Sequence, residues 1–194
     1  YIVMPLDGPS DGFKEFSVIT NEEANNVEIY LKGAATFQEK NYPAGSKLTV
    51  MLEPLQAIQI QSKDDLSGTR IVTSKPSAVL TGHSCTWKNT KCNHVYEQLL
   101  PTTSWGNTFI VPGIPFHVTP ENLPGAKPDF VFIAASKNTR LDYQAGSSKE
   151  TKNLAAGEVT KLDVYVSKPL YITANAGIQV MLYYTGWTTK DGTI

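Results

Sequence analysis

Short runs in which apolar and polar residues alternate recur along this chain. Clear examples are residues 27–31, 58–61 and 162–166, which are rich in Val, Ile, Leu and Tyr. Successive side chains of a β-strand point to opposite faces of a sheet, so this alternation predicts strands with one buried face. Residues 130–135 and 178–184 are almost continuously apolar, as in strands that are covered on both faces. We therefore predict an all-β fold.

Helical patterns are short by comparison. No window of convincing length has a helical period, and the best candidates are residues 93–100 and 21–26. Many of the twelve prolines lie at the ends of the alternating runs or between them, where a residue without an N–H does not interrupt a strand. We expect at most two short helices in a chain that is otherwise β.

A short internal echo suggests how the strands are organised. The tripeptide Ser-Lys-Pro occurs at residues 74–76 and again at residues 167–169. Because proline fixes φ and lacks an N–H, a strand is expected to begin just beyond each tripeptide. We predict two echoing β units that form one antiparallel β-sandwich domain, truncated from a longer protein. The expected division is a leading linker at residues 1–12, a first unit at 13–111, a proline-rich crossover at 112–129 and a second unit at 130–194.

Composition argues against two classes of partner. Of the 194 residues, 41% are apolar and 18% are charged, and the formal net charge is −1 with Lys and Arg scattered singly. The sequence has no basic stripe for a phosphate backbone, and no apolar run approaches the roughly 18 residues of a membrane-spanning helix. We expect no nucleic-acid partner and no membrane span.

Both cysteines and two of the three histidines fall in one segment. Cys85 and Cys92 are separated by six residues, and His83 and His94 flank them at alternate positions. One interpretation is a disulfide that closes a small loop, which would place the protein outside the cell. The other is a metal site, because alternate strand positions point the same way and pair each histidine with its neighbouring cysteine. The residues themselves leave both interpretations open.

The segment around these cysteines resembles a known family. The motifs that carry the resemblance are Ile60-Gln61-Ser62-Lys63-Asp64-Asp65-Leu66-Ser67-Gly68-Thr69-Arg70, Ser74-Lys75-Pro76, Gly82-His83-Ser84-Cys85, Cys92-Asn93-His94-Val95-Tyr96-Glu97-Gln98-Leu99-Leu100-Pro101 and Trp105-Gly106. They closely resemble the N-terminal domain of the IgG Fc-binding protein family, large secreted proteins of mucus, and of related extracellular proteins. The match is most specific over residues 52–112 and looser in the flanks.

The resemblance implies a secreted, extracellular module attached to von Willebrand-type repeats in a mucin-like or adhesive polymer. It also implies that Cys85 and Cys92 form a disulfide, and it brings no catalytic residues. The Gly-Asp-Pro-His self-cleavage sequence of the neighbouring repeats in such proteins does not occur in this chain. On this basis we expect no enzymatic activity, no cofactor and no bound metal.

A loop closed by this disulfide would present its side chains at fixed positions. Closing about eight residues contributes roughly 2.5 kcal/mol of stability, and a stapled loop loses less entropy on binding than a free one. We expect Trp87 to be exposed there, and we take Trp87, Lys88, His83 and His94 as the binding residues. The expected partner is a protein, which could be another copy of the chain, a mucin or an immunoglobulin Fc, or else a glycan.

Two other classes of function stay open as alternatives. A carbohydrate-binding module would need exposed aromatic rings beside polar groups in a groove. A metal-dependent enzyme would use the two cysteines and their flanking histidines, or a concave site that joins His94 to Glu97 and His117. The more ordinary role is for Glu97 or Gln98 to cap backbone groups where the chain turns at Pro101.

Two adjacent acids, Asp64 and Asp65, form a further candidate. Their carboxylates are of the type that binds calcium. Acidic residues followed by Ser and Gly are also typical of turns, because their side chains bond nearby backbone N–H groups. We predict an acidic hairpin turn between residues 58–61 and 70–73.

Overall fold

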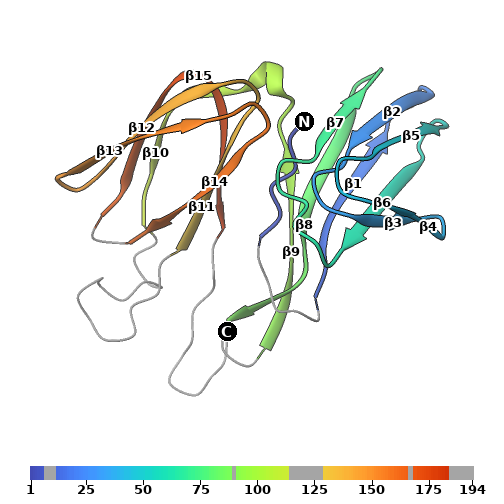
Figure 1. The fold of residues 1–194 in the computed structure, drawn as a ribbon, viewed down its shortest axis with the longest axis horizontal. Coiled ribbons are helices and arrows are strands. Elements are labelled where there is room, and N and C mark those ends of the chain that lie inside the picture. The colour runs from blue at the N-terminus through green and yellow to red at the C-terminus, as the bar shows by residue number, and fades with distance from the viewer. Residues whose placement is uncertain (7–11, 89–90, 114–128, 166–167, 184–194) are drawn as a thin grey trace. The chain divides into compact units, whose positions relative to one another are not determined.

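The fold was obtained as a computed structural model, which describes residues 1–6, 12–88, 91–113, 129–165 and 168–183. These residues form an almost entirely β structure with antiparallel pairing, as the alternation predicts. They fall into two compact units, which are Tyr1–Trp87 with Lys91–Pro101 (unit 1) and Lys88–Thr90 with Thr102–Ile194 (unit 2). The elements, drawn in Figure 1, are β1 (Lys14–Thr20), β2 (Asn25–Tyr30), β3 (Ala35–Phe37), β4 (Lys40–Tyr42), β5 (Lys47–Leu52), β6 (Ala57–Ser62), β7 (Arg70–Thr73), β8 (Ser77–Lys88), β9 (Lys91–Leu99), the 3-10 helix η1 (Thr102–Ser104), β10 (Gly106–Val111), β11 (Asp129–Ala135), β12 (Thr139–Ala145), β13 (Ser148–Leu154), β14 (Val159–Val164) and β15 (Leu170–Tyr183).

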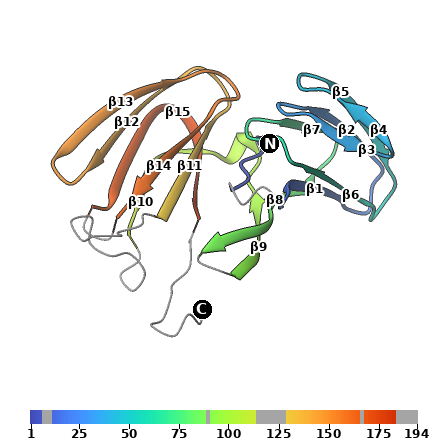
Figure 2. The same cartoon turned by 60° about the horizontal axis from the view of Figure 1, so that its bottom comes forward.

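Unit 1 contains two antiparallel sheets packed as a sandwich. One has the strand order β6-β1-β8-β9 and the other the order β5-β2-β7, while β3 and β4 form a separate hairpin. Figure 2 shows the sheet of β2, β5 and β7 lying over β1 and β6. The alternation in the sequence decides which faces meet, since Phe16 and Val18 of β1 are fully buried, as are Val27 and Ile29 of β2. These apolar faces form the core of the unit.

The first residues of the chain belong to this core. Ile2 and Val3 are almost fully buried. The backbone N–H of Val3 donates to the carbonyl of Thr69 at 2.9 Å, and the amino group of Tyr1 donates to the carbonyl of Ile71 at 2.9 Å. Within the range predicted as a leading linker, residues 1–6 are thus packed against unit 1, and residues 7–11 lie outside the described residues.

The acidic segment after β6 is a crossover between the two sheets, and the prediction of a hairpin turn was wrong. β6 pairs with β1 in one sheet, whereas β7 pairs with β2 in the other. Within the crossover, Asp64 accepts the N–H of Ala34 at 3.1 Å and Asp65 accepts the N–H of Ser67 at 2.9 Å. The carboxylates thus bond backbone groups as turn residues do. Strands β6 and β7 would show the same alternation of apolar and polar residues whether a hairpin or a crossover joined them. The sequence pattern therefore could not distinguish the two kinds of connection.

Neither short helix expected from the sequence is present: residues 93–99 and 25–26 lie in strands, and residues 21–24 contain a bend. Lys91–Leu99 forms β9, and Asn25–Tyr30 forms β2. Asn25 is fully buried, and its side-chain amide donates to the carbonyl of Lys75 at 3.0 Å and to the hydroxyl of Ser77 at 2.8 Å. Pairing with a neighbouring strand and burial of this amide outweigh the weak local preference for helix.

A strand begins directly after each Ser-Lys-Pro tripeptide, as proline geometry predicts. β8 starts at Ser77 and β15 starts at Leu170. The strand orders of the two units differ, however, so the repeated tripeptide shows only that one strand in each unit starts in the same way. The division into two echoing β units stays a prediction.

Unit 2 is a single curled sheet with the order β13-β12-β15-β11-β14, and β10 also pairs with β15. Residues 170–174 of β15 pair with β12, and residues 178–183 pair with β11. β10 pairs with both stretches, so β11 and β12 follow one another along the other edge of β15. β10 lies within the range predicted for the first unit but belongs to this sheet. The core of the sheet is Val111, Val131, Ile133, Ala135, Leu141, Leu154, Val164, Leu170, Ile172 and Ile178.

The strand pairing in the sheet of unit 2 has a gap. The gap lies between β11 and β12 and between β13 and β14, opposite the middle of β15. At this gap, asparagine side chains accept hydrogen bonds from backbone N–H groups in place of the carbonyls of a neighbouring strand. Asn138 accepts the N–H of Ala156 at 3.1 Å, and Asn175 accepts the N–H of Arg140 at 2.8 Å. The interruption lets the sheet bend while its backbone donors keep their hydrogen bonds.

Candidate functional site

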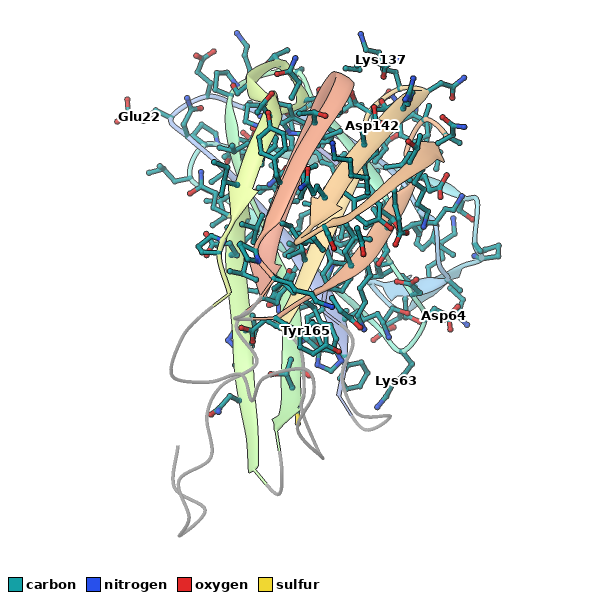
Figure 3. The ribbon with its side chains drawn as sticks, turned by 90° about the vertical axis from the view of Figure 1, so that its left-hand side faces the viewer. Glu22, Lys63, Asp64, Lys137, Asp142 and Tyr165 are labelled. Carbon is teal, nitrogen blue, oxygen red and sulfur yellow. The ribbon has the colours of Figure 1, made fainter. Side chains whose placement is uncertain are left out.

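The residues of the predicted site lie on two strands, β8 and β9. β1 begins at Lys14, which pairs with His83 of β8, and the N–H of Ser84 still donates to the carbonyl of Phe13 at 2.8 Å. Beyond this point β8 continues with β9 past the start of β1 (Figure 3). Thr86 donates a hydrogen bond from its hydroxyl to the carbonyl of Asn93 at 3.0 Å across these strands. We call residues 85–88 and 91–94 the β8–β9 arm.

His83 lies at the base of the arm and is buried. Its residue exposure is 1%, and its Nδ1 accepts the backbone N–H of Cys85 at 3.1 Å. Gly12 packs so closely that a Cβ added there would lie 2.3 Å from Cε1 of the imidazole. These contacts suit a side chain that supports the arm, and they leave almost no ring surface for a partner.

The two cysteines and the expected contact residues lie along the arm. Cys85 is half-buried and is not a free thiol. The side chains of Trp87, Lys88 and Cys92 lie outside the described residues. The Cys85–Cys92 pairing and the exposure of Trp87 therefore stay predictions.

His94 pairs with a carboxylate that the sequence analysis did not select. Its Nε2 lies 2.6 Å from Oε1 of Glu15, a residue 79 positions away in the sequence. The Glu15 side chain is 1% exposed, while that of His94 is 55% exposed. Gln59 and Gln61 donate to the other carboxylate oxygen at 2.9 and 2.5 Å. Both oxygens of this buried carboxylate are thus hydrogen-bonded, as the burial of a charged group requires.

Tyr96 reaches across β8 to the same region. Its hydroxyl is hydrogen-bonded to that of Ser17 on β1, and its ring centroid lies 5.2 Å from that of His94. The Tyr96 side chain can cross β8 only because residue 82 is a glycine. A Cβ added at Gly82 would lie 2.6 Å from Cδ2 of Tyr96 and 1.8 Å from the carbonyl oxygen of Val95. We call the interacting side chains the Glu15 cluster, which consists of Glu15, Ser17, Gln59, Gln61, His94 and Tyr96.

The Glu15 cluster uses its polar groups within the protein. Burial raises the pKa of Tyr96, and the hydrogen bond with Ser17 only partly offsets this, so the phenol is neutral at ordinary pH. Across the described ranges, no group of three or more His, Cys, Asp or Glu side chains is placed to hold a metal ion. The cluster ties β9 to β1 and β6, and this gives the arm a fixed root.

The other residues considered for an enzyme site do not join the cluster. Glu97 accepts the backbone N–H of Gln98 at 2.9 Å within β9, so it bonds a backbone group but not at the turn where this was expected. His94 is bonded to Glu15 in place of Glu97. His117 lies outside the described residues.

Sequence reasoning missed Glu15 and Ser17, although a weak signal was present. In residues 14–18, Phe16 and Val18 alternate with polar positions, so Glu15 and Ser17 share the face opposite the core. Such a face is ordinarily taken as exposed to water. That Glu15 is buried depends on partners in β6 and β9, which are distant in the sequence.

In the part of the chain that the structure describes, no helix is long and apolar enough to cross a membrane.

Comparison with known proteins agrees with the resemblance seen in the motifs. The family model described as "IgGFc binding protein" matches residues 1–194. The IgGFc-binding protein of Homo sapiens is 42% identical over 186 residues, which cover 96% of this chain but only 3% of that protein. No solved structure matches the chain. The chain belongs to the IgGFc-binding protein family.

Proposed function

We propose that this chain is a non-catalytic, extracellular binding module that holds a protein partner with the β8–β9 arm. The arm is the observation that carries the proposal, because β8 and β9 continue beyond the strand that pairs with the base of β8. A strand pair that leaves its sheet exposes side chains that cannot contribute to the sandwich core. Contact with another molecule is the use that this geometry supports best.

The root of the arm is suited to this role. The Glu15 cluster fixes β9 through the bonds of His94 and Tyr96, and buried His83 supports the base of β8. A surface that is already ordered loses less conformational entropy on binding than a mobile loop. The proposed Cys85–Cys92 disulfide would add to this order and fits an extracellular location.

An immunoglobulin Fc is the first partner to test, because the human relative is named for binding it. The chain spans 3% of that protein, so Fc binding by this segment is itself part of the proposal. A second copy of the chain and a mucin are the other candidates. Trp87 and Lys88 are the residues proposed to make contact, since Trp is enriched among residues that dominate binding energy.

The test is binding of the recombinant chain to an immobilised human IgG Fc fragment, measured by biolayer interferometry. We expect saturable binding that weakens by at least about tenfold in Trp87→Ala. Met51→Ala is the matched control, because Met51 is an apolar residue of β5 that is 60% exposed and outside the arm.

The outcomes separate the two parts of the proposal. Absence of binding to Fc would reject Fc as the partner, and light scattering together with a mucin pull-down would then test the other two candidates. Equal binding by wild type and Trp87→Ala, for whichever partner binds, would reject the arm as the contact surface.

A further inference from the structure

The face of the unit 2 sheet that points away from its core carries an ordered set of polar and aromatic side chains. Strand register places these side chains in rows, because residues directly opposite each other point to the same side. Asp142 lies opposite Thr151 on β13 and Thr173 on β15, and Gln144 lies opposite Lys149 and Tyr171. We call this the Tyr171 face, and its rows are Thr151, Asp142, Thr173 and Thr108, then Lys149, Gln144, Tyr171 and Ile110.

The Tyr171 face is hollowed. A groove of about 320 Å³ is lined by Asp142, Tyr143, Gln144, Lys149, Glu150, Thr151, Tyr171 and Thr173, which is near the lower end of the ~300–1,000 Å³ typical of small-molecule sites. A second depression of about 560 Å³, lined in part by Arg140, Asn153 and Asn175, lies where the sheet is interrupted. Arg140 bonds Asp142 at 3.0 Å, so the two depressions adjoin at that pair. Asp142 is labelled in Figure 3.

The groove offers polar atoms that the protein does not use. Among the residues that the structure describes, Oδ2 of Asp142, Oε1 of Gln144, the hydroxyl of Tyr171 and the ammonium of Lys149 have no hydrogen-bond or ion-pair partner. Tyr171 is 47% exposed. A ligand therefore finds an open aromatic ring flanked by both donors and acceptors.

The charge of the groove favours a neutral ligand. Hydrogen bonds from Thr151 at 2.5 Å and from Arg140 at 3.0 Å hold the pKa of Asp142 below its usual value, so the carboxylate is ionised at neutral pH. The negative charge of Asp142 is balanced by its ion pair with Arg140, and Lys149 adds a positive charge to a groove that Glu150 also lines. An anion would meet the carboxylate of Asp142, and an apolar segment would bury polar groups without partners.

We propose that the Tyr171 face binds a neutral carbohydrate, with the apolar C–H face of one sugar ring on Tyr171 and its hydroxyls bonded to Asp142 and Gln144. A sugar is the ligand class that presents one apolar face together with many hydroxyls that can both donate and accept. An aromatic ring contacts the apolar face of the sugar, and carboxylate and amide oxygens accept hydrogen bonds from its hydroxyls.

A longer glycan is expected to bind better than a single sugar. The second depression continues the same face past Arg140, with Asn153 directly opposite Arg140 on β13. Amide and guanidinium groups there extend the row of hydrogen-bonding partners for a second or third ring.

The experiment is saturation-transfer difference NMR of the whole chain with three neutral probes, which are lactose, mannotriose and triacetylchitotriose. We expect transfer to at least one probe, strongest at the protons of one ring face. The signal should fall at least about fivefold in Tyr171→Thr, which removes the ring and keeps a β-branched residue suited to a strand. Tyr171→Phe keeps the ring and should keep most of the signal.

Two further variants make the result specific. Asp142→Asn keeps the shape of the side chain and removes its charge, and we expect binding of the responding probe to weaken about tenfold. Met51→Ala on unit 1, which lies outside both the Tyr171 face and the arm, should leave the signal unchanged. No transfer from any probe at about 10 mM, or equal signals for wild type and Tyr171→Thr in folded protein, would overturn the proposal.

Discussion

The Glu15 cluster of unit 1 and the Tyr171 face of unit 2 are built from similar residues but use them differently. Each combines a carboxylate, a glutamine and a tyrosine from strands of one antiparallel sheet. In the cluster, Glu15 is 1% exposed and both of its oxygens are bonded to other side chains. On the Tyr171 face, the side chain of Asp142 is 43% exposed and its Oδ2 has no partner among the described residues.

Burial accounts for this difference. A carboxylate removed from water must recover its hydrogen bonds inside the protein, so the cluster is closed and has no acceptor left to offer. An exposed carboxylate is hydrated, so it can keep an unused oxygen at little cost and can exchange water for a ligand. The same residue types thus form an anchor in one unit and a candidate binding surface in the other.

The largest effect on the free energy of unfolding is expected for a substitution at Gly82. An alanine there would place its Cβ 1.8 Å from a backbone oxygen of β9 and would displace Tyr96, so we expect unfolding to become easier by about 3 kcal/mol. Gly106→Ala on β10 is the control, because its nearest contact is an ordinary 3.4 Å. Urea denaturation measures both. Equal stability of the two variants would show that Tyr96 does not cross β8 at Gly82.

The next effect concerns the arm. If Cys85 and Cys92 are bridged, reduction should add two hydrogens to the intact mass and lower the stability of unit 1 by roughly 2.5 kcal/mol. Intact-mass measurement with and without reductant, followed by thermal denaturation, checks both effects. Reaction of both cysteines with a thiol reagent in the native, unreduced protein would contradict the bridge.

A matched pair of substitutions compares the two carboxylates directly. Glu15→Ala removes three hydrogen bonds to a buried charge, and we expect a loss of about 2 kcal/mol in the free energy of unfolding. Asp142→Ala removes an exposed carboxylate and should change stability far less. Denaturant titration of both variants measures the difference. Equal losses would show that burial does not distinguish the closed cluster from the open face.

The smallest expected effect comes from the different causes that raise the pKa values of Tyr143 and Tyr96. The hydrogen bond from Tyr143 to Glu150 raises the pKa of Tyr143 to about 12, whereas burial is the main cause of the raised pKa of Tyr96. The stabilisation from the Tyr143–Glu150 bond is present below pH ~10 and is lost as pH rises through about 12. Between these values, wild type should lose slightly more stability than Tyr143→Phe.

Ultraviolet titration resolves the causes of these two shifts. In Glu150→Gln, the pKa of Tyr143 should move back toward its ordinary value, and that of Tyr96 should stay raised. If both pKa values respond to Glu150→Gln, or neither does, the assignment of different causes to the two tyrosines is wrong.

The sequence predicted more of the fold than of the site, for an identifiable reason. Alternation at residues 27–31, 58–61 and 162–166 predicted strands β2, β6 and β14, because the side-chain period of a strand is local. The same period predicted that Glu15 and Ser17 share a face. It gave no indication that His94, 79 positions away, covers that carboxylate.

The sequence by itself determined the all-β class, the strand starts after both Ser-Lys-Pro tripeptides and, through its motifs, the family. Only the tertiary structure decided that residues 91–99 form a strand, that His94 bonds Glu15, and that Tyr171 lies in a groove beside Asp142. Strand formation follows largely from neighbours in the chain. The partner of a side chain depends on which strands pair, and that pairing joins residues far apart in sequence through burial of whole faces.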